Sequence, residues 1–289
     1  MTDLLAARLQ MAFSLGFHII FACIGMVMPF LMAMAHWYWL KTRNKVYLSL
    51  TKSWMRGVAI FFAIGAVSGT TLAFELGLLF PKFMEHAGPI IGIAFAWEGT
   101  FFFLEAVALG MFIYGWNRIN KWVHWVSGLI VGISGVFSGL FVICANGWMN
   151  YPTGFDWVNG KAENIDSIAA MFNPVAIQQG IHMIIAAFIA IGFFVAGIHA
   201  VLILKEPNNT LHKAAFRIAL TFGAIAILVQ PISGDLISKQ VAKFQPAKFA
   251  AMESLFKTTK GAPLLIGGIP LEDREEVILG IHIPKALSF

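Results

Sequence analysis

The sequence predicts an all-α polytopic membrane protein, a helix bundle with six transmembrane helices followed by an external loop segment. The chain has 289 residues, of which 58% are hydrophobic and only 12% are charged. A soluble domain usually carries about 25% charged residues, so a soluble fold of this composition would lack polar surface. Apolar stretches near or above the ~20 residues that span a bilayer occur six times. Because lipid offers backbone groups no hydrogen-bond partners, each stretch should be a helix.

The six expected helices lie at about residues 13–40, 56–80, 90–115, 122–149, 174–204 and 214–237. Several tryptophans stand near their ends, as in the interfacial aromatic belt of membrane proteins: Trp37, Trp39, Trp116, Trp122, Trp125 and Trp148. We therefore divide the chain into a transmembrane bundle at 1–237 and an external segment at 238–289.

Several features indicate packing or exclude other protein classes. The net charge of +5 does not indicate nucleic-acid binding, because Lys and Arg lie in short clusters between apolar stretches. Cys23 and Cys144 lie inside apolar stretches and are expected to pack. The N-terminus has no basic region followed by a cleavage site, so we expect no removable signal peptide. The fourth helix carries a small-residue stripe that favours close helix packing, formed by Gly128, Gly132, Gly135 and Gly139.

Loop charge predicts the orientation of the bundle. The first, third and fifth connections hold ten Lys and Arg, whereas the N-terminal arm and the second and fourth connections hold three. Positive residues remain in the cytoplasm, so the N-terminus is expected outside. Six crossings return the chain to the outside, which makes 238–289 external. Its seven Lys and Arg do not oppose this orientation, because long external segments are translocated largely regardless of charge.

In this orientation, five helices carry a polar or ionisable group in the outer part of the membrane. The groups on these helices are His18, Glu75, Glu98, His182 and Asp235. Gln10 and Ser14 precede His18 at intervals of four residues, so the three share one helix face. Gln178 lies one turn above His182. Helices of random polarity would not agree on one layer, so this layer predicts a functional site.

Two carboxylates stand in the apolar stretch AWEGTFFFLEAV, residues 96–107. An intramembrane ionisable group costs roughly 2.5–3.5 kcal/mol on insertion scales. Glu98 and Glu105 are seven residues apart, so they share a helix face, with Glu105 about 10 Å deeper. Either carboxylate alone could serve as an interhelical hydrogen-bonding group. Together they favour a proton path or a cofactor ligand.

His18 and His182 favour a haem site, because imidazole is the standard haem ligand and a bundle can present it from facing helices. A histidine on one helix alone would more often be a packed core residue. No His-x-x-His, Glu-x-x-His or Cys-x-x-Cys spacing supports a zinc or di-iron site. Five other histidines at helix ends or in loops are interpreted as structural: His36, His86, His124, His199 and His212.

Several strings occur in an order and spacing that resemble subunit I, the larger subunit, of cytochrome bd quinol oxidases. They are ARLQMAFSLGFHIIF (7–21), EGTFFFLE (98–105), ANGWMNYP (145–152), NPVAIQQGIH (173–182) and GDL (234–236). KFAAME (248–253), followed by GGIP (267–270), resembles the start of that family's quinol-binding Q-loop. The resemblance covers essentially the whole chain, and its motifs are specific in combination.

The resemblance implies an enzyme that oxidises quinol and reduces dioxygen to water. The family uses three haems and no copper: haem b558, haem b595 and haem d, or a b-type haem in its place. By matching position, the resemblance implies that His18 is an axial ligand of a high-spin haem. It implies that His182 is one axial ligand of the low-spin haem b558.

The acidic and basic residues also match the family pattern. Glu98 and Glu105 correspond to an acidic pair implicated in the haem environment and in proton delivery from the cytoplasm. Lys248 and Glu253 correspond to a Q-loop pair implicated in quinol oxidation on the outer side. The implied partners are subunit II, quinol, dioxygen and membrane lipid, with a small single-helix subunit as a further candidate and no nucleic acid. The implied location is the plasma membrane of a bacterium or archaeon.

The chain departs from the family where it stops, at IHIPKALSF. Family members carry further helices after the Q-loop, which supply a Met ligand to the low-spin haem and a Glu near the other high-spin haem. We therefore expect either a piece of a longer subunit or a protein that another chain completes, and we favour the former.

Two other functions remain as alternatives. One is another dihaem, quinone-linked cytochrome b, although such proteins usually hold each low-spin haem between paired histidines, and only two well-placed histidines are present. The other is a proton-coupled transporter that uses Glu98 and Glu105, which leaves the histidines and the Q-loop-like segment unexplained. A reduced-minus-oxidised optical spectrum distinguishes the three.

Overall fold

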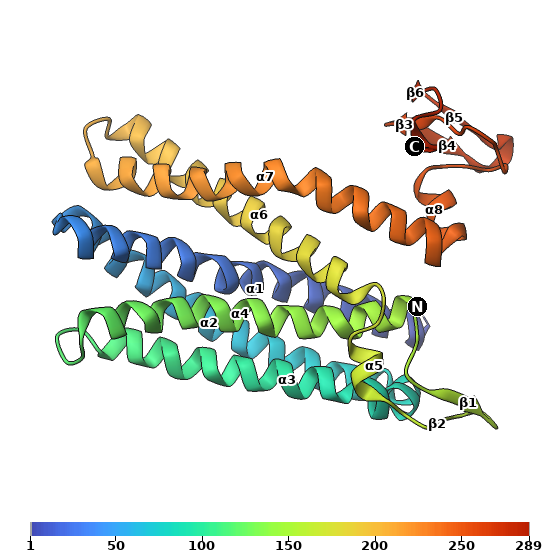
Figure 1. Cartoon of the computed structure of the whole chain (residues 1–289), viewed down its shortest axis with the longest axis horizontal. Coiled ribbons are helices and arrows are strands. Elements are labelled where there is room, and N and C mark those ends of the chain that lie inside the picture. The colour runs from blue at the N-terminus through green and yellow to red at the C-terminus, as the bar shows by residue number, and fades with distance from the viewer. Residues whose placement is uncertain (1, 289) are drawn as a thin grey trace. The chain divides into compact units, whose positions relative to one another are not determined.

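The computed structural model describes residues 2–288 and contains six long helices. They are α1 (Asp3–Thr42), α2 (Lys45–Leu79), α3 (Pro81–Tyr114), α4 (Lys121–Asn150), α6 (Ala176–Lys205) and α7 (Thr210–Phe244) (Figure 1). All six are long and apolar enough to cross a membrane, which confirms the predicted fold class.

Most of these helices extend beyond the apolar stretches that predicted them. α1 begins at Asp3 because the Thr2 side chain accepts a hydrogen bond from the Leu5 N–H and caps the first turn. Asn44 caps α2 in the same way by accepting from the Val46 N–H. Capping satisfies backbone donors that would otherwise lose their partners. An apolar stretch marks only the part of a helix that lies in lipid, so it does not reveal the polar turns at the helix ends.

α1 lies at the centre of the first compact unit, Met1–Ser233, where it packs against α2, α4 and α6. Its half beyond Cys23 supplies fully buried side chains such as Leu31, Met32 and Ala35. α3 packs along α4, and Phe188 of α6 stacks on Phe222 of α7 with ring centroids 6.0 Å apart. The contacts therefore place α1 and α4 in the interior of this unit.

The small-residue stripe of α4 is a packing surface, as expected. A Cβ added at Gly128 would stand 2.7 Å from the Phe112 ring of α3, and one at Gly132 would stand 2.7 Å from the Phe30 ring of α1. At Gly139 the added atom would meet Met26 of α1 at 2.6 Å. The stripe thus accommodates two neighbouring helices rather than one.

The outer faces of the long helices expose large apolar side chains. Phe13, Leu78, Leu204 and Leu228 each expose three quarters or more of their surface. Monomeric soluble proteins rarely expose apolar patches on this scale. These faces are therefore suited to lipid or to other membrane-embedded helices.

A segment with two short strands and one short helix joins α4 to α6. Strands β1 (Asp156–Val158) and β2 (Lys161–Glu163) form an antiparallel hairpin, and the short helix α5 (Ser167–Met171) packs on α3 and α4. Gly154 has a φ of +80°, and a Cβ there would stand 2.5 Å from the Asp166 carbonyl oxygen. Only glycine suits this close return of the chain.

The second compact unit, Gly234–Phe289, begins inside α7. It contains α8 (Pro246–Met252), two antiparallel strand pairs and two short 3₁₀ turns. β3 (Leu264–Ile266) pairs with β6 (Ile281–Ile283), β4 (Ile269–Leu271) pairs with β5 (Glu276–Ile278), and the turns are η1 (Glu272–Arg274) and η2 (Ala286–Ser288). α7 runs through the division expected between 237 and 238, so that boundary remains a prediction.

Candidate functional site

Polar side chains of α1 and α2 meet in one group. Glu75 of α2 is only 8% exposed, and its Oε1 accepts hydrogen bonds from Gln10 Nε2 (3.0 Å) and Ser14 Oγ (2.9 Å). Its other oxygen is buried with no hydrogen-bond partner among the described residues. The predicted polar face of α1 is therefore confirmed, and it faces α2.

His18 continues this face one turn further along α1. Its Nδ1 lies 2.9 Å from Ser68 Oγ of α2. Because the Ser68 hydroxyl donates to the Ile64 carbonyl oxygen (2.9 Å), its oxygen is left to accept from Nδ1–H. This arrangement favours the tautomer in which Nε2 carries the lone pair, the form that binds a metal.

Gly69 allows the His18 ring to lie against α2. A Cβ added there would stand 2.9 Å from Cε1 of the ring, which real Cβ atoms essentially never approach. The ring also contacts Ser68 through Nδ1, so a shift of the ring away from a side chain at position 69 would disturb that contact. The absence of a side chain at Gly69 therefore makes room for the ring.

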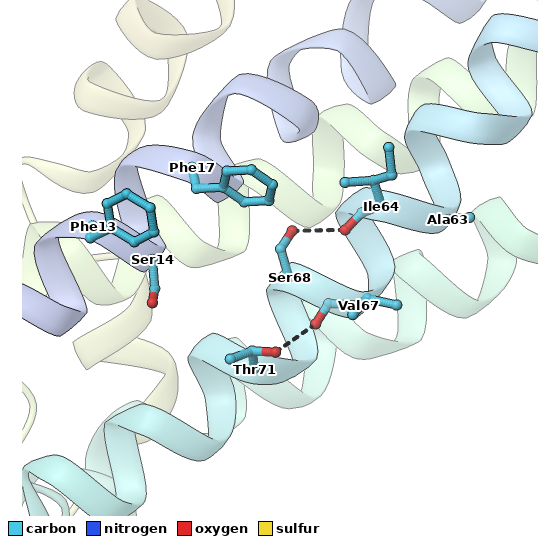
Figure 2. Close-up of a pocket in the computed structure, with 8 residues that line it drawn as sticks. All are labelled: Phe13, Ser14, Phe17, Ala63, Ile64, Val67, Ser68 and Thr71. Atoms are coloured by element: carbon cyan, nitrogen blue, oxygen red, sulfur yellow. Dashed lines mark hydrogen bonds between the residues drawn. The ribbon is translucent and has the colours of Figure 1, made fainter.

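A hollow of about 570 Å³ lies between α1 and α2 beside this histidine. Phe13 and Phe17 line it from α1, and Ile64, Val67 and Ser68 line it from α2 (Figure 2). Its volume is within the ~300–1,000 Å³ of ligand pockets, and like them it is mainly apolar with a few polar groups. Ser68 belongs to its wall and also holds His18, which links the hollow to the imidazole.

The two carboxylates of α3 both face α4, so the predicted shared face is confirmed. Glu98 Oε1 lies 3.5 Å from the donor Ser138 Oγ. Glu105 is 6% exposed and lies where Gly135 of α4 and Gly25 of α1 leave space. Among the described residues, no side chain donates a hydrogen bond to Glu105. A buried carboxylate without a donor is suited to holding a proton or meeting a buried water.

His182 of α6 contacts polar side chains of α7, and we call His182, Gln230 and Ser233 the His182 group. Its Nδ1 is 3.1 Å from Ser233 Oγ, and its Nε2 is 2.9 Å from the amide nitrogen of Gln230. The same amide nitrogen is 3.2 Å from Nδ1, and the shorter contact favours donation to Nε2, which leaves the ring proton on Nδ1 beside Ser233. Gln178 of α6 also donates to the Ser233 carbonyl oxygen at 3.3 Å.

The polar groups of the predicted layer form three separate interhelical sets. One joins α1 to α2, one joins α3 to α4 and one joins α6 to α7. Within residues 2–288 no hydrogen bond links one set to another. Asp235 belongs to none of them, because it pairs with the exposed Lys239 at 2.7 Å on the same helix.

The candidate quinol residues lie in the second unit. Lys248 is exposed on α8, and Glu253 follows directly after this helix, where its N–H donates to the Phe249 carbonyl oxygen at 3.0 Å. The seven-residue helix ends at Met252, so the two residues flank its last turn.

Sequence patterns did not reveal the partners of the site residues. These partners are Ser68, Ser138, Gln230 and Ser233. Each lies on a different helix from the residue it contacts and 40 to 51 positions away. An isolated Ser or Gln in an apolar helix was the only signal available, and such residues commonly bond to their own helix.

Comparison with known proteins identifies the family. Residues 6–289 match the family model for cytochrome bd terminal oxidase subunit I. The chain belongs to this family. It is 31% identical over 98% of its length to the cytochrome bd-II ubiquinol oxidase subunit 1 of Escherichia coli (strain K12). It is 30% identical over its whole length to the cytochrome bd ubiquinol oxidase subunit 1 of Bacillus subtilis (strain 168).

A solved structure agrees with the family assignment. The bd oxidase from Geobacillus thermodenitrificans matches 99% of this chain with a TM-score of 0.93 and 35% identity. The chain spans 56% and 62% of the two relatives and 66% of that solved chain. The predicted resemblance and helix bundle are therefore confirmed for the part of the family fold that the chain covers.

The cytochrome bd terminal oxidase family implies haem cofactors, and the residues of the site are suited to hold them. Both candidate ligands have Nδ1 beside a serine hydroxyl, so Nε2 is the nitrogen left for a metal. At His182 the Gln230 amide nitrogen lies 2.9 Å from Nε2, so this amide must turn aside for an iron to bind there. Beside His182, the buried Oε1 of Gln230 has no hydrogen-bond partner among the described residues, and beside His18 Gly69 forms a cradle that a Cβ would fill. These features fit a bound group that occupies the space next to each imidazole.

Proposed function

We propose that this chain is the haem-bearing part of a terminal respiratory oxidase in a bacterial or archaeal plasma membrane. The enzyme oxidises quinol on the outer side and reduces dioxygen to water. The observation that carries this proposal is the repeated pairing of imidazole and serine, His18 with Ser68 and His182 with Ser233, in a chain of the cytochrome bd family. The pairing supports metal ligation, because a ligating histidine normally donates its other N–H to a neighbouring group.

In this proposal His18 binds the iron of a high-spin haem, and His182 binds the iron of the low-spin haem b558. The haems, b558, b595 and haem d or a b-type haem in its place, supply the one-electron and dioxygen chemistry. Ser68 and Ser233 fix the tautomer and the ring orientation of their histidines. Gly69 keeps the space into which the His18 ring fits.

The overall reaction balances with quinol as the electron donor. Two quinols release four electrons and four protons on the outer side, and one dioxygen takes up four electrons and four protons to give two waters. If the protons for water come from the cytoplasm, quinol oxidation and oxygen reduction together transfer charge across the membrane. These protons must then cross a part of the membrane where water is scarce and titratable groups are costly to bury.

Glu105 and Glu98 are suited to carry these protons. The buried Glu105 accepts a proton from the cytoplasmic side and passes it about 10 Å outward along α3 to Glu98. Ser138 donates to Glu98 and orients its carboxylate for delivery to the haem region. The position of Glu105 against Gly25 and Gly135 supports this role, because its carboxylate lies in space left by two glycines rather than in a salt bridge.

The segment 238–289 contributes to the quinol site, with Lys248 and Glu253 as the residues that contact quinol. The excess of Lys and Arg in the first, third and fifth connections supports an external position for this segment. The assembled enzyme contains subunit II and membrane lipid, with a small single-helix subunit as a further partner. The further haem ligands come from helices that lie beyond the match in longer family members.

Quinol-dependent oxygen uptake tests this function directly. Membranes that carry the assembled oxidase should consume oxygen when quinol is added, and the cyanide-treated and quinol-free samples set the background rate. A transporter would give no quinol-dependent uptake, and a quinone-linked cytochrome b would reduce its haems without consuming oxygen. Either result in membranes with normal amounts of the chain would contradict the proposal.

A further inference from the structure

A second hollow, of about 230 Å³, lies at the end of the bundle where α1 and α3 end and α4 begins. Its wall includes His36 and Trp39 of α1, Trp116 of the α3–α4 connection, and Lys121 and His124 of α4. His36 lies 18 residues after His18, about 27 Å along the same helix. The hollow is therefore distinct from the candidate haem sites.

His36 is the unusual residue of this hollow. Its side chain is fully buried, yet neither ring nitrogen has a hydrogen-bond partner among the described residues. Its ring packs between Trp39 and Trp116, with centroids 5.4 Å away in each case. Burial of a polar group without a partner destabilises the folded state. Both nitrogens are covered, so a group bound in the hollow accepts the His36 N–H only when the ring turns its edge to the hollow, and this bond would remove that destabilisation.

His124 does not satisfy His36. Its Nε2 is 2.8 Å from the Phe112 carbonyl oxygen, so it donates there, and its ring is perpendicular to the His36 ring at 5.0 Å. No hydrogen bond joins the two imidazoles. His36 and His124 therefore line the same hollow without a hydrogen bond to each other.

Positive charge surrounds the hollow. Lys121 lines it, the Lys52 ammonium lies 5.1 Å from the Trp116 ring centroid, and the Arg43 guanidinium lies 5.7 Å from that of Trp39. The adjoining chain segments 41–56 and 115–121 contain no Asp or Glu. α4 also begins at Lys121, so the positive end of its helix dipole lies here. This environment favours an anion and opposes a cation.

We propose that this hollow binds a phosphate group, with the His36 N–H and the Lys121 ammonium donating to its oxygens. A phosphate offers several acceptor oxygens to donors that converge from α1 and α4, and helix N-termini commonly bind this group. The site serves no step of the proposed oxygen reduction. Its ligand is either inorganic phosphate or the phosphate of a lipid headgroup, since both present the same oxygens.

Binding is measured on the assembled oxidase by titration with inorganic phosphate, using calorimetry in phosphate-free buffer. One phosphate should bind for each chain, and Lys121→Gln should weaken binding roughly tenfold, the effect of losing one charge-assisted hydrogen bond. Lys213→Gln is the matched control, because it removes the same charge at the same end of the bundle, on α7, and should leave binding unchanged.

His36→Phe separates the binding role from a structural one. The variant keeps an aromatic ring between Trp39 and Trp116 and removes both unpartnered nitrogens. It should unfold at the wild-type temperature or higher in the absence of phosphate, because no polar atom remains to be buried without a partner. It should also bind phosphate at least tenfold more weakly than the wild type.

The lipid source is tested with the same proteins in nanodiscs. Native mass spectrometry counts the lipids retained from discs of phosphatidylglycerol and from discs of a phosphate-free diglucosyl diacylglycerol. One phosphatidylglycerol retained by the wild type and by Lys213→Gln, but not by Lys121→Gln, would assign the site to a lipid headgroup. Saturable binding of inorganic phosphate with the same variant pattern would assign it to the free ion. If neither probe binds, or if Lys121→Gln and His36→Phe bind both like the wild type, the hollow holds only water and the proposal is wrong.

Discussion

The carboxylate of Glu105 faces Gly135 across the contact between α3 and α4. A Cβ added at Gly135 would stand 3.4 Å from Glu105 Oε2 and 3.3 Å from Met26 Cα of α1. Three helices therefore meet around one buried carboxylate that has no donor among the described residues. A stripe of glycines that promotes packing also provides the space in which this carboxylate lies.

The proton-relay role predicts the behaviour of Glu105→Gln. The amide has nearly the same shape as the carboxyl group, so the haem content should remain normal. Gln cannot release a proton, so the rate of oxygen reduction should fall by roughly 10²-fold, a typical contribution of a positioned acid or base. The rate is measured as quinol-dependent oxygen uptake per haem. A wild-type rate would contradict the proton-relay role and leave Glu105 as an interhelical hydrogen-bonding group.

Glu98→Gln serves as the comparison on the same helix face. Glu98 contacts Ser138 and is proposed to deliver protons to the haem region or to help hold a haem. This variant should alter the high-spin haem spectrum as well as the rate. If both variants altered the spectrum equally, the separate roles of the two carboxylates would not hold.

Gly69→Ala tests whether the His18 ring needs the space on α2. The new methyl group would stand 2.9 Å from the ring, which cannot be accommodated without displacing the imidazole. The high-spin haem spectrum should therefore change, or this haem should be lost. Gly77→Ala is the matched control on the same helix, because nothing lies within 4 Å of its added Cβ. An unchanged spectrum in Gly69→Ala would separate His18 from the high-spin haem site.

Gly192→Ala tests the contact between α6 and α7 that supports the His182 group. Its added Cβ would stand 2.7 Å from the backbone of Gly223, and backbone cannot move aside as a side-chain end can. The free energy of unfolding should fall by about 1–3 kcal/mol, the usual cost of overpacking. Gly197→Ala on the same helix meets nothing within 4 Å and should be neutral or slightly stabilising. Thermal unfolding in detergent compares the two, and equal unfolding temperatures would contradict the close crossing.

Glu253→Ala tests the quinol site in the second unit. Loss of this carboxylate should depress quinol oxidation and leave every haem spectrum intact, because the residue belongs to the second compact unit and both candidate haem ligands belong to the first. Asp273→Ala removes an exposed carboxylate of the same unit and should retain wild-type turnover. Protease cleavage of the segment from the outside should reproduce the Glu253 defect. Normal turnover after both treatments would exclude the segment as the donor site.

Much of this arrangement could be predicted from the sequence because it depends on local periodicity. Six apolar stretches predicted six helices, and intervals of four and seven residues placed Ser14 with His18 and Glu98 with Glu105. The structure bears out these helix faces because the helical repeat alone determines them. The helix ends were less predictable, since capping by Thr2 and Asn44 depends on single polar residues outside the apolar stretch.

The sequence could not predict which helices these faces would meet. Ser68 and Ser233 carry no local signal, and only the tertiary packing brings them to His18 and His182. The predicted single polar layer consists of three interhelical sets in the described chain, because hydrogen bonds form between neighbouring helix pairs. The position of His36 at a helix end indicates a structural residue, and only the packed bundle shows that the ring is buried without a hydrogen-bond partner among the described residues.

The reduced-minus-oxidised optical spectrum of His182→Ala tests whether His182 binds the low-spin haem. The assembled oxidase with the unaltered chain should give haem bands that include the low-spin b558 signal. Alanine offers no ligand in place of imidazole, so the variant should lose this signal, while Ser233→Ala should retain the haem with altered affinity or potential. If His182 is an axial ligand, b558 is lost in His182→Ala at normal levels of the chain in the membrane. An intact low-spin spectrum in that variant would contradict this assignment.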